Sequence, residues 1–237
     1  MELILHRGIS VEPQKAAEII DNIKNNGISG SEGNMWKFTI ADILDVRKRI
    51  EDIFSKEQPT RGDVCNQFPH KGICACGDEI GPRFYALKHN RDKEKRAGII
   101  ISFKANLDDV YVDCRDFLCP AFQFWDRVSD RWKNQQTAIL SDLFGPAVLR
   151  YFERCVSSSD QQVRIAMCNL ASYDVIVIKS HYENRNVIGG RYGVRFCSAF
   201  FVKAPIPASS IISCNIVEGE FDEPELYTDM WKFQKCS

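Results

Sequence analysis

The sequence predicts an α+β protein whose sheet is largely antiparallel. Helical periodicity near the N-terminus is followed by strand-like segments, a long helical stretch, and strands again in the last third of the chain. Helices and strands that are segregated in this way favour α+β over alternating parallel βαβ units. The 237 residues are 44% hydrophobic and 27% charged, which is a globular composition, and we expect one domain over residues 1–237.

The N-terminal elements have the clearest signals. Residues 3–9 predict a strand, and Pro13 suits the first turn of a helix over residues 14–25. Apolar residues recur along that helix at i, i+3, i+4 and i+7, so one of its faces is buried, and Gly27 provides the stop signal. Residues 40–54 predict a second short helix after a Gly-, Ser- and Asn-rich loop.

The remaining elements follow from apolar runs and turn residues. Residues 56–82 contain Pro, Gly and Cys without periodicity, so we expect a long loop there. The stretch 121–155 has helical periodicity, and Pro146 separates two helices within it. The further expected strands cover residues 83–87, 98–104, 110–113, 175–178, 192–203 and 210–218.

Charge and hydropathy exclude several classes of protein. The 31 Lys and Arg balance 32 Asp and Glu, so the formal charge of −1 excludes a broad basic field, and any nucleic-acid contact must be local. The basic run over residues 88–96 is a candidate for such a contact, although runs of this kind are usually solvated surfaces. No apolar run approaches the ~20 residues of a membrane span. The N-terminus lacks a secretory h-region, and we expect a cytoplasmic protein without membrane contact.

The ten cysteines predict reduced thiols rather than a disulfide framework. Their densest group contains Cys65, Cys74 and Cys76, with His70 between them. A C-x-C pair without a matched second pair fits structural zinc poorly, so we expect no metal. No Cys/His pairing stands out as a nucleophile and its base.

Four segments, in their order and spacing, resemble the ADP-ribosyltransferase superfamily, of poly(ADP-ribose) polymerase-like or bacterial toxin type, whose enzymes split NAD and transfer ADP-ribose. The resemblance covers residues 3–218, apart from a central stretch over residues 110–165. The segments are Leu5-His6-Arg7-Gly8 with its following helix and turn, Gly81-Pro82-Arg83-Phe84-Tyr85-Ala86, residues 170–178, and residues 197–211.

The resemblance implies a split antiparallel sheet with flanking helices, a helical insertion at about residues 120–165, and NAD as a substrate. It places Arg7 beside the cofactor, with His6 in reserve and Gly8 next to it, because alternation along a strand aims only one of the two basic residues at the ligand. It also implies that Phe84 and Tyr85 lie at the cofactor and that Tyr85 stacks on nicotinamide.

The required chemistry suits these residue types. Cleavage of the nicotinamide–ribose bond develops positive charge that a carboxylate stabilises, and an arginine fork matches phosphate oxygens. Arg7 is equally interpretable as a solvated charge at a strand end, and Tyr85 as a core aromatic residue.

The departure from the family pattern is the catalytic glutamate, because Ala199 occupies its place. No Glu lies in residues 187–217, while Glu183 precedes this segment and Glu218 follows it. Two interpretations remain open. Either the chain is a catalytically inactive relative, or this sequence carries an inactivating Glu-to-Ala change.

The resemblance, with the size of the chain, suits the toxin of a toxin–antitoxin or phage-defence system, with an antitoxin protein as a possible partner. We favour a nucleic-acid acceptor, an RNA or DNA base, because the basic run at 88–96 offers a local rim and Trp36 and Phe38 are able to stack on a base. A protein acceptor, or a non-catalytic module that binds a nucleotide or a partner, are the alternatives.

Overall fold

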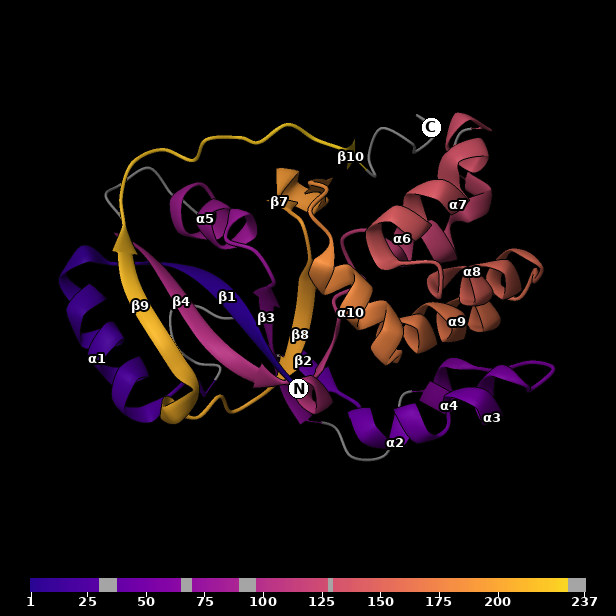
Figure 1. Ribbon diagram of the computed structural model, residues 1–237, viewed down its shortest axis with the longest axis horizontal. Helices are drawn as coiled ribbons and strands as arrows, with labels where there is room; N and C mark the ends of the chain where they lie inside the picture. The colour runs from indigo at the N-terminus through magenta and orange to yellow at the C-terminus, as the bar shows by residue number, and fades with distance from the viewer. Residues whose placement is uncertain (30–37, 65–69, 90–96, 128–129, 230–237) are drawn as a thin grey trace.

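A seven-stranded sheet forms the centre of the molecule, and a three-stranded sheet lies beside it (Figure 1). The computed structural model describes residues 1–29, 38–64, 70–89, 97–127 and 130–229. The strands are β1 (Glu2–Val11), β2 (Phe38–Ile40), β3 (His70–Cys76), β4 (Ala97–Asn106), β5 (Val110–Val112), β6 (Ile188–Gly189), β7 (Arg195–Phe196), β8 (Ala199–Lys203), β9 (Ile211–Val217) and β10 (Thr228–Asp229).

The helices range from four residues in α4 to fifteen in α7. They are α1 (Ala16–Asn26), α2 (Ile43–Lys48), α3 (Ile50–Phe54), α4 (Arg61–Val64), α5 (Ile80–Leu87), α6 (Leu118–Gln123), α7 (Asp130–Phe144), α8 (Val148–Val156), α9 (Gln161–Tyr173) and α10 (Val175–Glu183). The chain is therefore α+β, as the sequence predicts.

The large sheet is split between two of its central strands. Its strand order is β5-β8-β3-β1-β4-β9, with β2 beside β3, and all of its described pairs are antiparallel. Strand β1 pairs with β4 along its whole length but meets β3 in register only at His6 and Cys76. Beyond that single pair, β1 and β3 diverge.

Helices cover the sheet in two groups (Figure 1). Helix α1 packs along β9, and α5 lies across β1 and β4. Helices α6 to α10 gather beyond the β5 edge, where Tyr111 of β5 stacks on Tyr173 of α9 with ring centroids 4.9 Å apart. After β9 the chain returns over α5, where Phe221 contacts Phe84 edge to face at 5.5 Å, and reaches β10.

Several expectations are confirmed. The strands predicted over residues 3–9, 98–104, 110–113 and 210–218 are β1, β4, β5 and β9. The helix predicted over residues 14–25 is α1, preceded by a 3-10 turn over Pro13–Lys15. The predicted helical stretch is present, its break at Pro146 separates α7 from α8, and the helices continue to Glu183.

The strand predicted over residues 83–87 is wrong, because this segment forms α5. The carboxylate of Asp78 accepts hydrogen bonds from the backbone N–H groups of Ile80 and Gly81, which caps the start of the helix. Pro82 lies in the first turn, where a missing N–H costs no intrahelical hydrogen bond. Phe84 and Leu87 then bury the apolar face.

The strand predicted over residues 175–178 is also wrong, because Val-Ile-Val-Ile opens helix α10. The Asp174 carboxylate accepts a hydrogen bond from the backbone N–H of Ile176, so the residue caps the helix. Val177 and Ile178 are fully buried while Ile176 is 62% exposed, which is a helical rather than an alternating pattern. Capping and packing outweigh the modest strand preference of β-branched residues.

The long loop predicted over residues 56–82 is wrong, since it contains α4, the central strand β3 and the start of α5. Strand β3 has four of its seven residues buried, without alternation, so no period of two appears in the sequence. The helix predicted over 40–54 begins instead at Ile43 behind its Asp42 cap, and the strand predicted over 192–203 is β7 and β8 after a 3-10 turn.

Gly8 provides a test of this packing. A Cβ at Gly8 would lie 1.8 Å from the backbone oxygen of Pro82, so α5 approaches β1 more closely than any side chain permits. We expect Gly8→Ala to lower the free energy of unfolding by about 1–3 kcal/mol or more in urea denaturation. Gly62→Ala is the control, because its nearest neighbour would be Thr60 Oγ1 at 3.6 Å, and its stability should be unchanged or slightly higher. Equal effects of the two substitutions would contradict this account.

Candidate functional site

A row of residues crosses the three central strands at the point where the sheet divides. His6 of β1 is in register with Cys76 of β3, which is in register with Ala199 of β8. Directly opposed residues of antiparallel strands share one face, and two strand spacings put His6 and Ala199 about 10 Å apart. A Cβ on Gly81 would meet Cys76 Sγ at 2.6 Å, so the start of α5 covers this face.

Ala199 is held by its backbone at the start of β8. Its N–H donates to Nε2 of His181 at 3.1 Å, and its carbonyl accepts from the backbone N–H of Asp113 at 2.9 Å. His181 in turn lies 2.9 Å from the carbonyl oxygen of Leu143 through Nδ1, so the ring is the neutral Nδ1–H tautomer. Burial lowers the pKa of His181 to about 4. Ala199 is 7% exposed.

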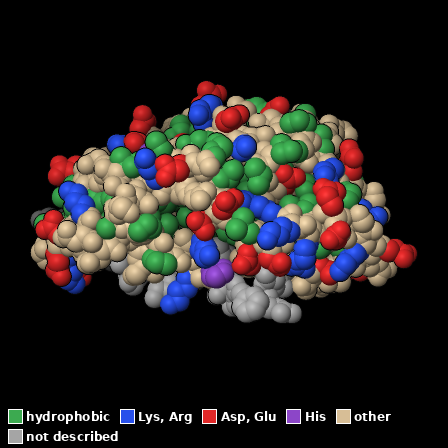
Figure 2. Space-filling model, turned by 60° about the horizontal axis from the view of Figure 1, so that its bottom comes forward, with side chains coloured by type: hydrophobic (Ala, Val, Ile, Leu, Met, Phe, Trp, Pro, Cys, Tyr) green, Lys and Arg blue, Asp and Glu red, His purple; other side chains and the backbone are tan. Residues whose placement is uncertain are grey.

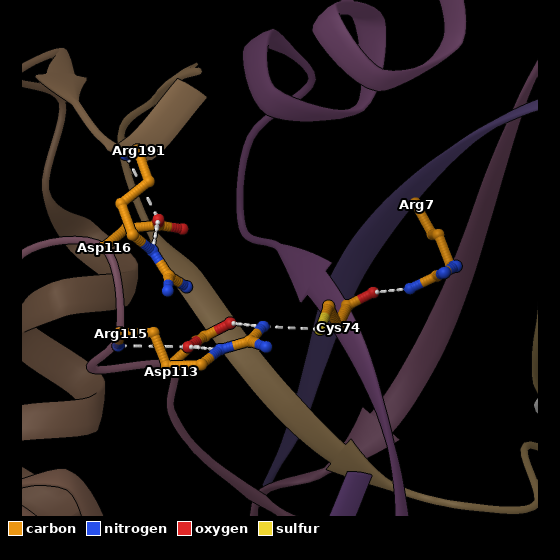
Figure 3. Close-up of polar contacts among 6 residues, drawn as sticks. All are labelled: Arg7, Cys74, Asp113, Arg115, Asp116 and Arg191. Carbon is orange, nitrogen blue, oxygen red and sulfur yellow. Dashed lines mark hydrogen bonds and ion pairs between the residues drawn. The ribbon is translucent and has the colours of Figure 1, made fainter. Parts of the chain in front are cut away.

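Arg7 lies in the gap between β1 and β3. It belongs to the same alternating row as Leu5 and Ile9, which are buried in the core. Its Nη1 donates to the carbonyl of Cys74 at 2.6 Å (Figure 3). In a sheet without the split, this carbonyl would accept a hydrogen bond from a backbone N–H of β1. Among the described residues its buried Nε has no hydrogen-bond partner, and burial lowers the pKa of the guanidinium.

His6 and Gly8, the neighbours of Arg7, face α5 and β4 instead. Nδ1 of His6 lies 2.9 Å from Oγ of Ser102, and burial lowers its pKa against the opposing charges of Glu79 and Asp78. Gly8 makes room for Pro82. The structure therefore brings Arg7 alone of the two basic residues into the split.

Tyr85 and Phe84 lie on α5, next to this gap, rather than on a strand. Tyr85 contacts Phe84 and His89 edge to face, with ring centroids 5.6 and 5.1 Å away. Burial, with the nearby charge of Asp116, raises the pKa of its phenol. The ring of Tyr192 lies 6.2 Å from His89, is 81% exposed and has a φ of 57°, an unusual backbone conformation for an aromatic residue.

Four charged residues, none of them predicted from the sequence, form a polar cluster on the other side of Cys74 from Arg7 (Figure 3). We call it the Asp113–Arg191 cluster. Both oxygens of Asp113 accept from the guanidinium of Arg115, at 2.9 and 2.7 Å, and Arg115 also contacts Cys74 Sγ at 3.1 Å. Oδ1 of Asp116 accepts from the backbone N–H and Nε of Arg191, at 3.2 and 3.0 Å.

Asp116 is the member of this cluster best suited to acid–base chemistry. Burial and the carboxylate of Asp113 raise its pKa, while the hydrogen bonds and charge of Arg191 oppose the shift. Both oxygens of Asp78 and of Asp113 accept hydrogen bonds, whereas those found for Asp116 within the described ranges all go to Oδ1. The only sequence feature that indicates this cluster is the spacing Asp113-x-x-Asp116 around Arg115. It lies in the segment without family resemblance.

The cysteines on β3 are buried thiols. Burial and the nearby carboxylate of Asp113 raise the pKa of Cys74 to about 12, and burial raises that of Cys76 as well. No three His, Cys, Asp or Glu residues in the described part of the chain are arranged to hold a metal ion. Cys65, the third thiol of the candidate group, lies outside the described residues.

Most of the residues considered for an acceptor are not among those that the structure describes. Trp36 and residues 90–96 lie outside the described residues, and Phe38 begins β2. Lys88 forms an ion pair with Glu223, so the described start of the basic run is neutralised by the returning C-terminal segment. Glu183, the acid nearest before Ala199 in the sequence, is exposed at the end of α10.

Comparison of the chain with protein-family models, with curated proteins and with solved structures gave no match. Within the described ranges, every helix is too short or too polar to cross a membrane.

The buried ring of His181 predicts a pH-dependent stability. Between pH 6.5 and about 4 the unfolded state binds a proton at this ring and the folded state does not, so stability falls as the pH falls. We expect a loss of about 2 kcal/mol between pH 7 and pH 5 from this residue in urea denaturation. His181→Gln keeps an acceptor for Ala199 but does not titrate, so its pH slope should be shallower by that amount. An unchanged slope would contradict this account, because it would show that the His181 ring binds protons equally in the folded and unfolded states.

Proposed function

We propose that the protein is an NAD-dependent ADP-ribosyltransferase that binds NAD along the split between β1 and β3. The observation that carries the proposal is the buried guanidinium of Arg7 in that split, whose Nε has no hydrogen-bond partner among the described residues. The phenol of Tyr85 lies close enough to interact electrostatically with this guanidinium. Arg7 and Tyr85, which the sequence resemblance assigns to NAD, lie on β1 and α5, and the packing of these two elements against each other supports the proposal.

The position of Arg7 suits the phosphates of a dinucleotide. A buried guanidinium is costly unless an anion compensates it, and no carboxylate within the described ranges forms an ion pair with Arg7. Arginine offers a fork of N–H donors that matches phosphate oxygens. Tyr85 and His89 provide an adjacent aromatic surface for a planar ring.

The reaction breaks the bond between the ribose C1′ and the nicotinamide nitrogen. Nicotinamide leaves with the bond's electron pair, the acceptor's nucleophilic atom bonds to C1′, and the acceptor's proton passes to a base. A carboxylate near the ribose stabilises the positive charge that develops. Ala199 occupies the place of that carboxylate in the family pattern. Asp116, with its raised pKa and available oxygen, is the native acid of the site best placed to take a proton.

For the acceptor we favour a nucleic-acid base and a toxin role in the cytoplasm, opposed by an antitoxin protein. Figure 2 supports only local recognition, because acidic and basic side chains are intermixed over the described part of the face it shows. A near-neutral protein of this kind holds a nucleic acid through a few contacts rather than a field. Protein side chains are the alternative acceptor.

A second candidate function is a binding module that recognises NAD, another nucleotide or a partner without cleaving it. The small, buried side chain of Ala199 favours this candidate, because it leaves no carboxylate at this position. The backbone N–H of Ala199 also donates to His181 of α10, so that helix lies close to the start of β8. Both candidates require Arg7, and they differ in whether a carboxylate at position 199 produces turnover.

Substitution of Ala199 separates the two candidates. We expect Ala199→Glu to release nicotinamide from NAD roughly 10²-fold faster than Ala199→Gln, because the two side chains differ in charge rather than in size. Nicotinamide is measured by chromatography, and thermal unfolding shows whether both variants are folded. Glu183→Ala in the same background should leave the activity unchanged. Equal turnover by Glu and Gln variants that bind NAD would support the binding module, and loss of activity with Glu183→Ala would overturn the alignment.

Substitution of Arg7 tests the cofactor site directly. We expect Arg7→Gln to weaken NAD binding roughly tenfold or more in calorimetry, because a hydrogen bond to a charged group contributes about 1.5–3 kcal/mol. Arg154→Gln is the matched control, since Arg154 also has a buried Nε and donates to the backbone carbonyls of Lys56 and Glu57 in the helical layer. Equal affinities of the two variants would exclude Arg7 from the NAD site.

The acceptor is tested with the active variant. After expression of Ala199→Glu, we expect mass spectrometry to find ADP-ribose on host RNA or DNA, and Ala199→Gln to leave both unmodified. ADP-ribose found on proteins alone would assign a protein acceptor and exclude the nucleic-acid one.

A further inference from the structure

A strap of chain over residues 218–227 joins β9 to β10 and crosses over α5 without forming a helix or a strand (Figure 1). We call this segment the acidic strap, because it contains five Glu and Asp residues and neither Lys nor Arg. The whole chain has a formal charge of −1. The acidic strap is therefore a local run of negative charge in a nearly neutral protein.

The acidic strap is anchored at both of its ends. Phe221 contacts the ring of Phe84 edge to face at 5.5 Å, and it packs with Val217 against a small apolar cluster of α5 and β4. At the other end, the backbone N–H of Tyr227 donates to the carbonyl of Val187 at 3.0 Å, and β10 pairs with β6. The middle of the strap is held differently, by ion pairs between side chains.

Glu223, in the middle of the acidic strap, lies between two cations. One of its carboxylate oxygens forms an ion pair with Lys88 at the end of α5, and the other lies 3.6 Å from Nη2 of Arg195 on β7. Helix α5 packs on β7, so these two cations come together although they are 107 positions apart in the sequence. One carboxylate therefore occupies a place where two positive charges converge.

Glu223 balances the charge of Arg195 without satisfying its donors. A separation of 3.6 Å is too long for a hydrogen bond, and the buried Nε of Arg195 has no hydrogen-bond partner among the described residues. The side chain of Arg195 is only 16% exposed, and its Nη1 donates to the carbonyl of Gly193 at 3.1 Å, which orients the guanidinium. A phosphate group, which is larger and has more acceptor oxygens than a carboxylate, suits such a guanidinium.

We propose that Lys88 and Arg195 form a binding subsite for the backbone phosphates of a single-stranded nucleic acid, and that Glu223 occupies this subsite when no nucleic acid is bound. The acidic strap resembles a nucleic-acid strand in carrying several negative charges in succession along one path. This likeness favours a strand over a small anion as the ligand. A single strand is favoured over a duplex because its bases are accessible to an enzyme.

The exchange of Glu223 for a phosphate requires little free energy. The side chains of Lys88 and Glu223 are both about half exposed, and ion pairs of this kind contribute little because water screens them. The two anchors of the acidic strap do not involve Glu223, so its middle is able to lift while its ends stay in place. This inference rests on the proposed nucleic-acid acceptor, but it does not rest on the cleavage of NAD.

The first experiment measures binding of a fluorescein-labelled single-stranded RNA by anisotropy, without NAD. We expect Glu223→Gln to bind the RNA roughly three- to tenfold more tightly than the native protein, because the competing carboxylate is removed. Asp222→Asn is the matched control, since it removes the same charge from the adjacent residue, which forms no ion pair within the described ranges. Its affinity should stay within about twofold of the native value. Equal gains for both variants would reveal general repulsion and overturn the proposal.

The second experiment measures how the same affinity depends on salt. Lys88→Gln should weaken binding and reduce the slope of log affinity against log salt by about 0.7, because one cation fewer neutralises a phosphate. Lys104→Gln is the control, since Lys104 on β4 is equally exposed and also pairs with an acid, Glu2. It should change neither the affinity nor the slope. The same slope for Lys88→Gln and the native protein would overturn the subsite.

The third experiment detects displacement of the acidic strap in the native protein by a protease that cleaves after Glu. Saturating RNA should speed cleavage after Glu220 and Glu225 at least about threefold, because a lifted segment is cleaved more easily than a held one. RNA that binds without changing this cleavage would lie elsewhere, and that result would also overturn the proposal.

These measurements distinguish failure of this inference from failure of the proposed NAD chemistry. Nicotinamide release by Ala199→Glu, without RNA binding by any variant, would overturn the inference and leave the NAD reaction supported. The expected RNA results without nicotinamide release would support the inference and count against the NAD reaction. Calorimetry with NAD gives a further outcome. A higher affinity of Glu223→Gln for NAD, with an unchanged affinity for RNA, would assign the subsite to NAD and overturn the proposal.

Discussion

The divergence of β1 from β3 is the constraint on which the rest of the structure depends. A strand that leaves its neighbour inside a protein exposes backbone carbonyls that must find other donors. The carbonyl of Cys74 finds one in the guanidinium of Arg7, which keeps the gap open and places a cation within it. The guanidinium of Arg7 therefore has two effects. Its hydrogen bond to Cys74 maintains the split in the sheet, and its positive charge makes the split a candidate anion site.

Much of the fold was predictable wherever local pattern and tertiary packing agree. Strand β1 and helix α1 show their periods in the sequence because each has one dominant buried face, whereas β4 shows itself as a continuous apolar run that is buried on both faces. The sequences of α5 and α10 predict strands because their apolar runs are rich in aromatic or β-branched residues. Their start is decided by single carboxylates, Asp78 and Asp174, which cap them. Those capping residues were visible in the sequence but were outweighed by the apolar pattern.

The candidate site was predictable only in part, for a different reason. The resemblance points to Arg7 and Tyr85, and the strand and the helix that hold them pack against each other. The alternation that buries Leu5 and Ile9 would by itself send Arg7 into the core, and only the split in the sheet gives it a polar partner. The pairing of Asp116 with Arg191 joins residues 75 positions apart, which no local pattern specifies.

The strand order has a consequence for how the chain reaches this structure. Strand β8 fills the space between β5 and β3, and β9 completes the other edge beside β4, yet both come from the last 40 residues of the chain. During synthesis, the edges of β3 and β4 that pair with β8 and β9 therefore stay unpaired until those two strands have been made. Such long-range closure is slow and leaves unpaired strands open to wrong partners. The open edges of β3 and β4 are therefore the places where a partly synthesised chain is most exposed to aggregation.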